Sequence, residues 1–426
     1  MSNNKYHYGY TIVACCFLIM FIIVGLIMSC AGIFYKPVSE DLGIDVGSFG
    51  LYMSFNFLFS TLALSFAGKV MEKYSARTVL TLCSAVAGVT LASMSQFNAV
   101  WQFYVAGALF GITLAFLLYL GFPTLLNRWF KSRMGIFIGI CSAGSGIGGV
   151  LFNPVGGYLI TNYGWCATYL IFGALILLLV TPVLGVFLRD YPKDKGLEPY
   201  GASDAKNTQT VKNDNADANM QTATPKNVPE SGIEYAKAIR MPIFYGMVVF
   251  AFLMNAAATL NVFIPAYVQS VQFSIEEASF VASAAMVGVT VGKVLLGMIN
   301  DRSTTGGVLT TTGLGIVGLA FLLLGHLHIS VSIAGGFLFG WAYAGVSVQT
   351  PLLVRSVFGN KNYAQIYGNV SMAIAVGGAI AAGGWGLLSD AAGFGFILTL
   401  GIGFLVVSGG IGLYALRINN LTLDRH

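Results

Sequence analysis

Long runs of apolar residues, separated by short polar breaks, make up most of the chain. An α-helix needs about 20 such residues to cross a bilayer. Runs such as 170–188 are apolar on every side, so they do not fit the alternating pattern of membrane β-barrel strands. The pattern predicts twelve transmembrane helices, at 8–34, 46–68, 77–95, 100–127, 134–160, 164–188, 241–268, 276–300, 307–326, 329–354, 363–389 and 393–416.

Composition supports an all-α integral membrane protein. Of the 426 residues, 56% are hydrophobic and only 9% are charged, whereas an average soluble domain carries about 25% charged residues. So few charges cannot cover a soluble surface, which excludes a cytosolic enzyme, a secreted domain and a nucleic-acid binder. The six cysteines all lie inside apolar runs, and we expect them to pack as small apolar side chains rather than to form disulfides or bind metal.

One segment has a different composition from the rest. Residues 189–240 are rich in Lys, Asp, Asn, Thr and Pro and contain few apolar side chains. Such a segment buries too little surface to offset the entropy lost on ordering. We therefore expect a six-helix bundle at 1–188, a cytoplasmic linker at 189–240 and a second six-helix bundle at 241–426.

The distribution of charge sets the orientation of the helices. With twelve spans, all Lys and Arg residues fall on one side of the membrane except Lys36 and Lys293. Positive charge marks the cytoplasmic side, so both termini and the linker are expected there, in a multi-pass protein of the cell membrane. The opposite side carries Glu40, Asp41, Asp45, Glu276 and Glu277.

The two halves are related by a weak internal repeat. A shift of 229 residues superimposes eight glycines of the first half on glycines of the second. Because each unit has an even number of helices, both copies have the same orientation. Parallel repeats are typical of transporters whose halves rock around a substrate site near the membrane midplane. The matched glycines are Gly68, Gly107, Gly111, Gly139, Gly148, Gly149, Gly157 and Gly164.

A short motif appears in both halves, at 68–77 and at 297–302. It has a glycine, three residues, an acid and a base, and it resembles the loop signature of the major facilitator superfamily. Glu72 replaces the usual aspartate, and the second copy lacks the later basic residues. The resemblance implies a charge cluster that holds one conformation, although topological charge alone is the alternative. The gating residues would be Gly68, Glu72, Lys73, Arg77, Gly297, Asp301 and Arg302.

Three further stretches resemble the monocarboxylate porter and oxalate–formate antiporter branches of that superfamily. They are Phe34–Gly43, Asn127–Gly135 with its Arg-Trp-Phe and Arg-Met-Gly elements, and Tyr191–Leu197. This resemblance implies a small organic anion as the substrate, without selecting one.

Lys293 is the strongest candidate for binding that anion. It lies eight residues before Asp301, roughly 12 Å from the helix end at about 1.5 Å per residue. A lysine at the centre of a membrane helix costs about 2.5–3.5 kcal/mol, and no Asp or Glu lies within any predicted span. An anionic ligand or a water-filled cavity would compensate; a structural lysine bonded to carbonyl groups is the alternative.

The antiporter branch places a cationic residue at the position of Lys293, and a second cation at the position of Val370. A single buried cation fits one carboxylate better than two, so the resemblance favours a monocarboxylate over oxalate. Weaker lining candidates are Tyr119, the helical stripe Tyr343, Ser347 and Thr350, and Asn255, Asn261 and Asn369. Interhelical hydrogen bonding is the alternative for each of them.

Two coupling schemes follow from a lone intramembrane lysine. If Lys293 stays charged, the empty carrier resists closing and the protein exchanges anions. If Lys293 releases its proton when empty, anion and proton bind together and are cotransported. An Asp, Glu or His relay is not expected, because His326 and His328 lie at an outer loop.

Other functional classes fit less well. The sequence contains no HExxH or GxSxG pattern, so we expect no enzyme, metal or cofactor, and the short loops offer no signalling domain. Carriers of a dicarboxylate such as oxalate, of a neutral solute or of a drug remain alternatives. The expected partners are a small organic anion, a proton in the symport scheme, and the lipid bilayer around a monomer, with no nucleic acid.

Overall fold

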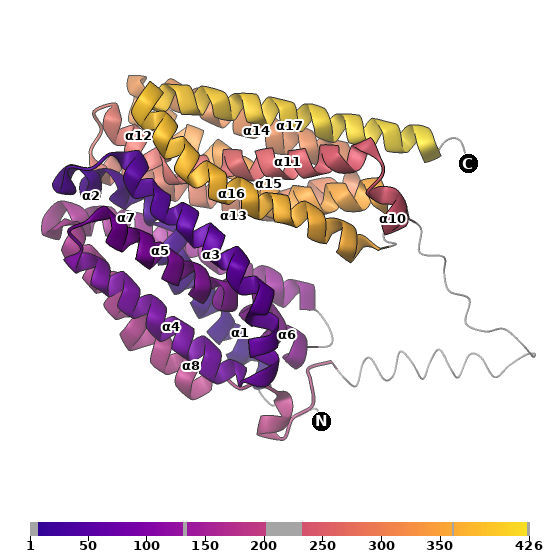
Figure 1. Cartoon of the computed structure of the whole chain (residues 1–426), viewed down its shortest axis with the longest axis horizontal. Helices are drawn as coiled ribbons and strands as arrows, with labels where there is room; N and C mark the ends of the chain where they lie inside the picture. The colour runs from indigo at the N-terminus through magenta and orange to yellow at the C-terminus, as the bar shows by residue number, and fades with distance from the viewer. Residues whose placement is uncertain (1–6, 131–133, 202–231, 360–361, 424–426) are drawn as a thin grey trace, which may run out of the picture.

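The computed structural model describes residues 7–130, 134–201, 232–359 and 362–423. Two bundles of long helices lie side by side in it (Figure 1), and these ranges contain no β-strand beyond two isolated bridges. Both termini lie at the same end of the molecule, and there the bundles are apart (Figure 1). We call this end the terminal face and the opposite end, where the bundles come together, the far face.

The first bundle is built from eight α-helices and from shorter π and 3-10 segments within its spans. In chain order they are α1 (Gly9–Leu18), the π-helix η1 (Ile19–Ser29), the 3-10 helix η2 (Ala31–Phe34), α2 (Tyr35–Leu42), α3 (Val46–Lys73), α4 (Ala76–Ser93), the 3-10 helix η3 (Met94–Gln96), α5 (Val100–Leu114), the π-helix η4 (Ala115–Gly121), α6 (Phe122–Trp129), α7 (Met134–Leu175), the π-helix η5 (Ile176–Val180) and α8 (Thr181–Phe187).

The second bundle is more regular. It comprises α11 (Pro242–Ala258), the 3-10 helix η7 (Thr259–Val262), α12 (Ile264–Ser270), α13 (Ile275–Arg302), α14 (Thr304–Leu323), the 3-10 helix η8 (Gly325–Leu327), α15 (Ile329–Phe358), α16 (Tyr363–Ala392) and α17 (Phe394–Leu423). Between the bundles, the described segments contain the short turn η6 (Pro192–Lys195) and α10 (Tyr235–Ala238).

The twelve predicted spans are present. Eleven helical stretches of the described chain are long and apolar enough to cross a membrane. One of them, Phe137–Phe187, contains two spans, because Gly164 reverses the chain with φ at 80°. A side chain would strain this conformation, which glycine adopts freely. The all-α fold with two six-helix units is therefore confirmed.

Some predicted helix ends were wrong. The first span extends to Leu42 rather than to 34, because the chain passes through η2 and continues as the polar helix α2. The ninth span lies at Thr304–Leu323 rather than at 307–326. It starts early because Ser303 caps it, with its hydroxyl accepting the Gly306 N–H at 3.0 Å. The apolar pattern indicates how long a membrane span is, whereas the capping residue decides where its helix begins.

The repeat is visible in the helix boundaries. A shift of 229 residues carries α3 (Val46–Lys73) onto α13 (Ile275–Arg302) and the first residue of α7 onto that of α16. The reversing Gly164 falls on Gly393, which has φ at 83°. The break of the first span at η2 is matched by the break of the seventh at η7, which starts one residue earlier than the shift predicts.

Equivalent glycines bring equivalent helices into backbone contact. A Cβ on Gly107 or Gly111 of α5 would overlap backbone atoms of Tyr52 or Asn56 on α3. In the second bundle, a Cβ on Gly336 or Gly340 of α15 would meet backbone atoms of α13. Small residues allow such close packing in membranes, where helix association depends on van der Waals contact.

This packing predicts a difference between two glycine substitutions. In Gly340→Ala, the added methyl group would overlap the Ala285 carbonyl group and the Val289 N–H, and we expect a loss of about 1–3 kcal/mol of stability. Gly313→Ala on α14 adds its methyl group to open space and is the control. Thermal unfolding of the purified proteins measures both, and equal melting temperatures would contradict the packing argument.

The described ends of the predicted linker attach to equivalent positions of the two bundles. The Tyr200 N–H donates to the Trp129 carbonyl group, and the Ile233 N–H donates to the Phe358 carbonyl group, both at 2.8 Å. Trp129 and Phe358 end α6 and α15 and are related by the same shift of 229 residues. Residues 202–231 lie outside the described part of the chain, so the division at 189–240 stays a prediction.

Candidate functional site

Lys293 lies on the face of α13 that packs against α7 of the other bundle, next to the last contacting residue. Ser283 donates its hydroxyl hydrogen to the Val150 carbonyl group at 2.7 Å. Met286 and Thr290 fill the space beside Gly149 and Gly146, where a Cβ would overlap them. Spacings of three and four residues keep side chains on one helix face. The series of contacting positions is Ser279, Ser283, Met286 and Thr290, and the next position in it is Lys293.

The packed contact between α7 and α13 ends just before Lys293. Towards the terminal face, a Cβ added to Gly139 of α7 or to Gly297 of α13 would meet no atom within 4 Å. Lys293 is half-buried at this transition. Within the described chain, its ammonium group makes no hydrogen bond or ion pair. Lys293 therefore lies at the closed end of the space between the bundles.

Two tyrosines lie near the depth of Lys293. Its neighbour Gly292 packs against Trp341 and Ala344 of α15, which places Tyr343 at about the same depth as Lys293. Tyr119, in η4 of the other bundle, lies near Tyr343. Its side chain is 43% exposed, and η4 is a π-helix, a distortion often found at functional sites.

The predicted stripe on α15 divides into accessible and enclosed parts. Tyr343 is half-buried and Ser347 is exposed, with its hydroxyl donating to the Ala344 carbonyl group at 3.1 Å. Thr350 is fully buried. One helix face thus presents two accessible polar groups and a third that is enclosed in this conformation.

The three asparagines lie in different environments. Asn255 of α11 donates to the Ile374 carbonyl group of α16 at 2.7 Å, which ties two helices of one bundle together. Asn369 donates to the Tyr235 hydroxyl group at 3.1 Å, near the terminal face. Asn261 is buried in η7, and its side-chain oxygen has no hydrogen-bond partner within the described chain. Asn255 and Asn369 thus donate within the protein, whereas the Asn261 oxygen is buried without a donor in the described chain.

Among the described side chains of the predicted gating residues, no contact across the bundles is present at the terminal face. A Cβ on Gly68 or Gly297 would meet open space. Arg77 donates to the Gly185 carbonyl group within its own bundle, with Nε at 2.6 Å. Lys73 lies over the Tyr74 ring, with its Nζ atom 5.5 Å from the ring centre.

The second copy of the motif is exposed. Asp301 and Arg302 both face solvent, and Asp301 borders a hollow of about 340 Å³. Arg355 also lines this hollow. The side chain of Glu72 lies outside the described side chains. The gate role of these residues stays a prediction.

Two acids that the sequence analysis did not select make structural contacts. Asp190 accepts the Ala76 and Arg77 N–H groups at 2.7 and 2.8 Å and so caps α4. Asp390 accepts the Gly47 N–H from the other bundle at 2.8 Å. Each lies two residues after the last leucine of an apolar run, and that placement was the available signal.

The described side chains offer no metal site. No group of three or more His, Cys, Asp or Glu residues gathers there. All six cysteines are free thiols, and Cys15, Cys16, Cys30 and Cys141 are buried. Their expected role as apolar packing residues agrees with this placement.

The comparison with protein families matches this architecture. Residues 17–327 match the family model described as Major Facilitator Superfamily. The chain belongs to the Major Facilitator Superfamily. Its family and fold are those of secondary transporters, which are multi-pass membrane proteins that move small solutes.

Relatives in this superfamily are distant. The uncharacterized MFS-type transporter YhjX of Escherichia coli (strain K12) is 26% identical over 340 residues, which are 76% of this chain and 75% of that protein. Monocarboxylate transporter 12 of Rattus norvegicus is 25% identical over 302 residues, which are 69% of this chain. That match spans only 61% of the rat protein.

Solved structures of superfamily members share the fold. A variant of the nucleoside transporter NupG superimposes with a TM-score of 0.72 at 14% identity, covering 96% of this chain and 99% of that one. A bacterial homologue of the human lysosomal transporter Spinster gives a TM-score of 0.68, also at 14% identity, over 97% and 98%. Such low identities show the fold alone.

Proposed function

We propose that this transporter carries a small organic anion, with a monocarboxylate as the best-fitting substrate, and that Lys293 binds its carboxylate. The observation that carries the proposal is the position of Lys293. It continues the α13 face that meets the other bundle, and it has no partner within the described chain. A charge left unpaired in a low-dielectric interior is costly, and an oppositely charged ligand removes that cost.

The number of cations supports one carboxylate rather than two. Val370, at the position where the antiporter branch has its second cation, is fully buried and apolar. Tyr119 and Tyr343, one from each bundle, lie near each other. Tyr343 is at about the depth of Lys293, and Ser347 is accessible on α15. Four of the predicted lining residues have a smaller role in the proposal, because they either donate hydrogen bonds within the protein or are enclosed by it. They are Asn255, Asn261, Asn369 and Thr350. The similarity to monocarboxylate transporter 12 points in the same direction.

The proposed cycle is alternating access in a monomer. By the charge distribution, the terminal face is cytoplasmic, so the conformation described here is open towards the cytoplasm. An anion that neutralises Lys293 allows the loaded bundles to close around it and to open on the far face. In that second state, the predicted gating residues would hold the terminal face closed. They are Gly68, Glu72, Lys73, Arg77, Gly297, Asp301 and Arg302.

Counterflow into proteoliposomes tests the substrate class. We expect vesicles loaded with an unlabelled short monocarboxylate to accumulate the labelled compound, with little response to oxalate, nucleosides or sugars. Preference for a neutral solute would contradict the proposal. That outcome would favour the alternative carriers, since the fold is shared with a nucleoside transporter.

The same vesicles separate the two coupling schemes. Exchange predicts uptake only when anion is present inside. Symport predicts uptake into empty vesicles when the outside is made acidic, because a proton enters with each anion. Both schemes use the same cation at Lys293, so this measurement assigns the coupling without retesting the site.

A further inference from the structure

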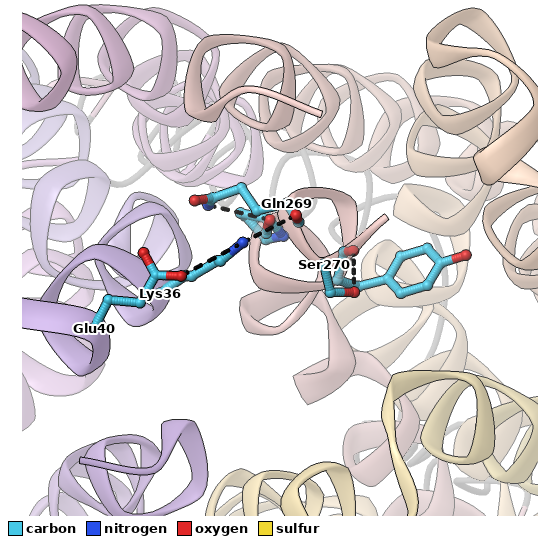
Figure 2. Close-up of polar contacts among 6 residues, drawn as sticks. Lys36, Glu40, Gln269 and Ser270 are labelled. Carbon is cyan, nitrogen blue, oxygen red and sulfur yellow. Dashed lines mark hydrogen bonds and ion pairs between the residues drawn. The ribbon is translucent and has the colours of Figure 1, made fainter. Parts of the chain in front are cut away.

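On the far face, two charged side chains reach across the boundary between the bundles to helix ends. Lys36 of α2 donates to the Gln269 carbonyl group of α12 at 3.0 Å, and its Nζ atom lies 3.6 Å from a carboxylate oxygen of Glu40 (Figure 2). Asp390 of α16 accepts the Gly47 N–H of α3 at 2.8 Å. One contact joins a first-bundle cation to the second bundle, and the other joins a second-bundle anion to the first.

Each charged side chain is attracted to the helix end that it contacts in the other bundle. It is repelled by the end of the helix on which it lies. A helix is partially positive at its N-terminus and partially negative at its C-terminus. Lys36 lies in the first turn of α2, where a cation is unfavourable, but it contacts the last turn of α12 (Ile264–Ser270). Asp390 lies in the last turn of α16, where an anion is unfavourable, but it contacts the first turn of α3.

The N-terminus of α3 lacks a cap from its own bundle. Asp45 occupies the N-cap position, and its side chain makes no capping hydrogen bond. The Gly47 N–H is therefore satisfied by Asp390 only while the bundles are together on the far face. Orphan N–H groups at a helix start need such a partner or water.

The backbones meet at the same place. A Cβ on Gly47 would overlap the Asp390 carboxylate and lie 2.5 Å from the Gly386 carbonyl carbon. A Cβ on Gly386 would lie 2.5 Å from the Gly47 Cα atom. Glycine at both positions lets the carboxylate come close enough to cap α3.

We propose that these reciprocal caps form a latch that holds the far face closed, and that both caps break when the bundles part there. Opening exchanges each protein–protein cap for water at the helix end, so the latch sets the balance between the two open states. It acts on the conformational equilibrium and does not depend on which solute is carried.

Accessibility of a buried thiol tests the latch. The Ser54 hydroxyl oxygen is buried without a partner in the described chain, next to Gly383 of the other bundle. In full-length protein with Cys83 and Cys166 replaced by serine, Ser54→Cys places one thiol in this contact. Its rate of maleimide labelling in lipid nanodiscs, after subtraction of the same protein with Ser54, reports opening of the far face.

We expect Asp390→Ala, Lys36→Met and Gly47→Ala each to raise the labelling rate, by roughly threefold or more for a charge lost from a helix end. Asp390→Asn keeps an acceptor for the Gly47 N–H and should fall between parent and Asp390→Ala. Two controls should label no faster than the parent, because the Asp45 charge opposes that of Asp390 rather than holding it in place. Asp45→Asn removes a charge from the same helix start without removing a cap, and Gly384→Ala adds a methyl group to open space on α16.

Because Asp390 and Gly47 form one contact, the double variant Asp390→Ala with Gly47→Ala should label more slowly than the product of the single effects predicts. Parent-like labelling in Asp390→Ala and Lys36→Met would overturn the proposal. An equal rise in Asp45→Asn would do the same, since general loss of acidic charge would then explain the effect. A rise in only one cap variant would refute the reciprocal arrangement.

Discussion

Replacing Lys293 with alanine should abolish carboxylate transport. The substrate would then enter a low-dielectric site without a counter-ion, and breaking such a pair costs roughly 3–5 kcal/mol, which corresponds to about a 100-fold loss or more. Counterflow of the labelled monocarboxylate in proteoliposomes measures the loss. Lys293→Arg should retain more activity than Lys293→Ala, because it keeps the charge but changes its shape.

A second readout separates this role from a structural one. In the empty protein, Lys293 has no partner within the described chain, so removing its charge should leave the melting temperature unchanged or raise it. A lysine that bonds the fold together would instead lower it when replaced. Lys69→Ala, which removes an exposed cation at the terminal end of α3, is the matched control and should transport normally. Full transport by Lys293→Ala would end the site assignment.

The fold could be predicted from the sequence because its main constraint is simple. A bilayer requires apolar helices of a narrow length range, and the charges between them fix their number. The glycine matches predicted the repeat, and the structure extends it to the helix ends of α3 and α13. Local capping could not be predicted in this way. The Ser303 cap moved one helix start by three residues, since one hydroxyl group changes no apolar pattern.

The candidate site was only partly predictable, for a related reason. A lone charge such as Lys293 stands out in an apolar span, so sequence alone singles it out. Asn255 and Asn369 look equally polar in the sequence, yet their amides bond to Ile374 and Tyr235. Which asparagine keeps a free group depends on neighbours more than a hundred residues away. The sequence analysis did not select Asp390, because its partner is the backbone N–H of Gly47. A backbone group cannot be recognised from the residue type.

Gly146→Leu should stop transport while leaving the protein folded. Gly146 of α7 lies against Thr290 of α13, and even a Cβ there would overlap the Thr290 side chain. A leucine would keep the bundles from meeting on the far face, one turn from Lys293. The contact exists between bundles and not within one, so each bundle can fold unchanged and only the conformation described here is lost. We expect about a 100-fold loss of counterflow if the clash costs roughly 3 kcal/mol.

Gly139→Leu is the matched control on the same helix. Gly139 lies two turns nearer the terminal face, where a Cβ meets no atom within 4 Å, so the same side chain should leave this conformation intact. The labelling rate of Ser54→Cys should rise in Gly146→Leu and stay at the parent value in Gly139→Leu. Equal transport by the two variants would mean that α7 and α13 need not meet at Gly146 during the cycle. If only Gly146→Leu loses transport and its labelling rate rises, transport requires the bundles to close on the far-face side of Lys293.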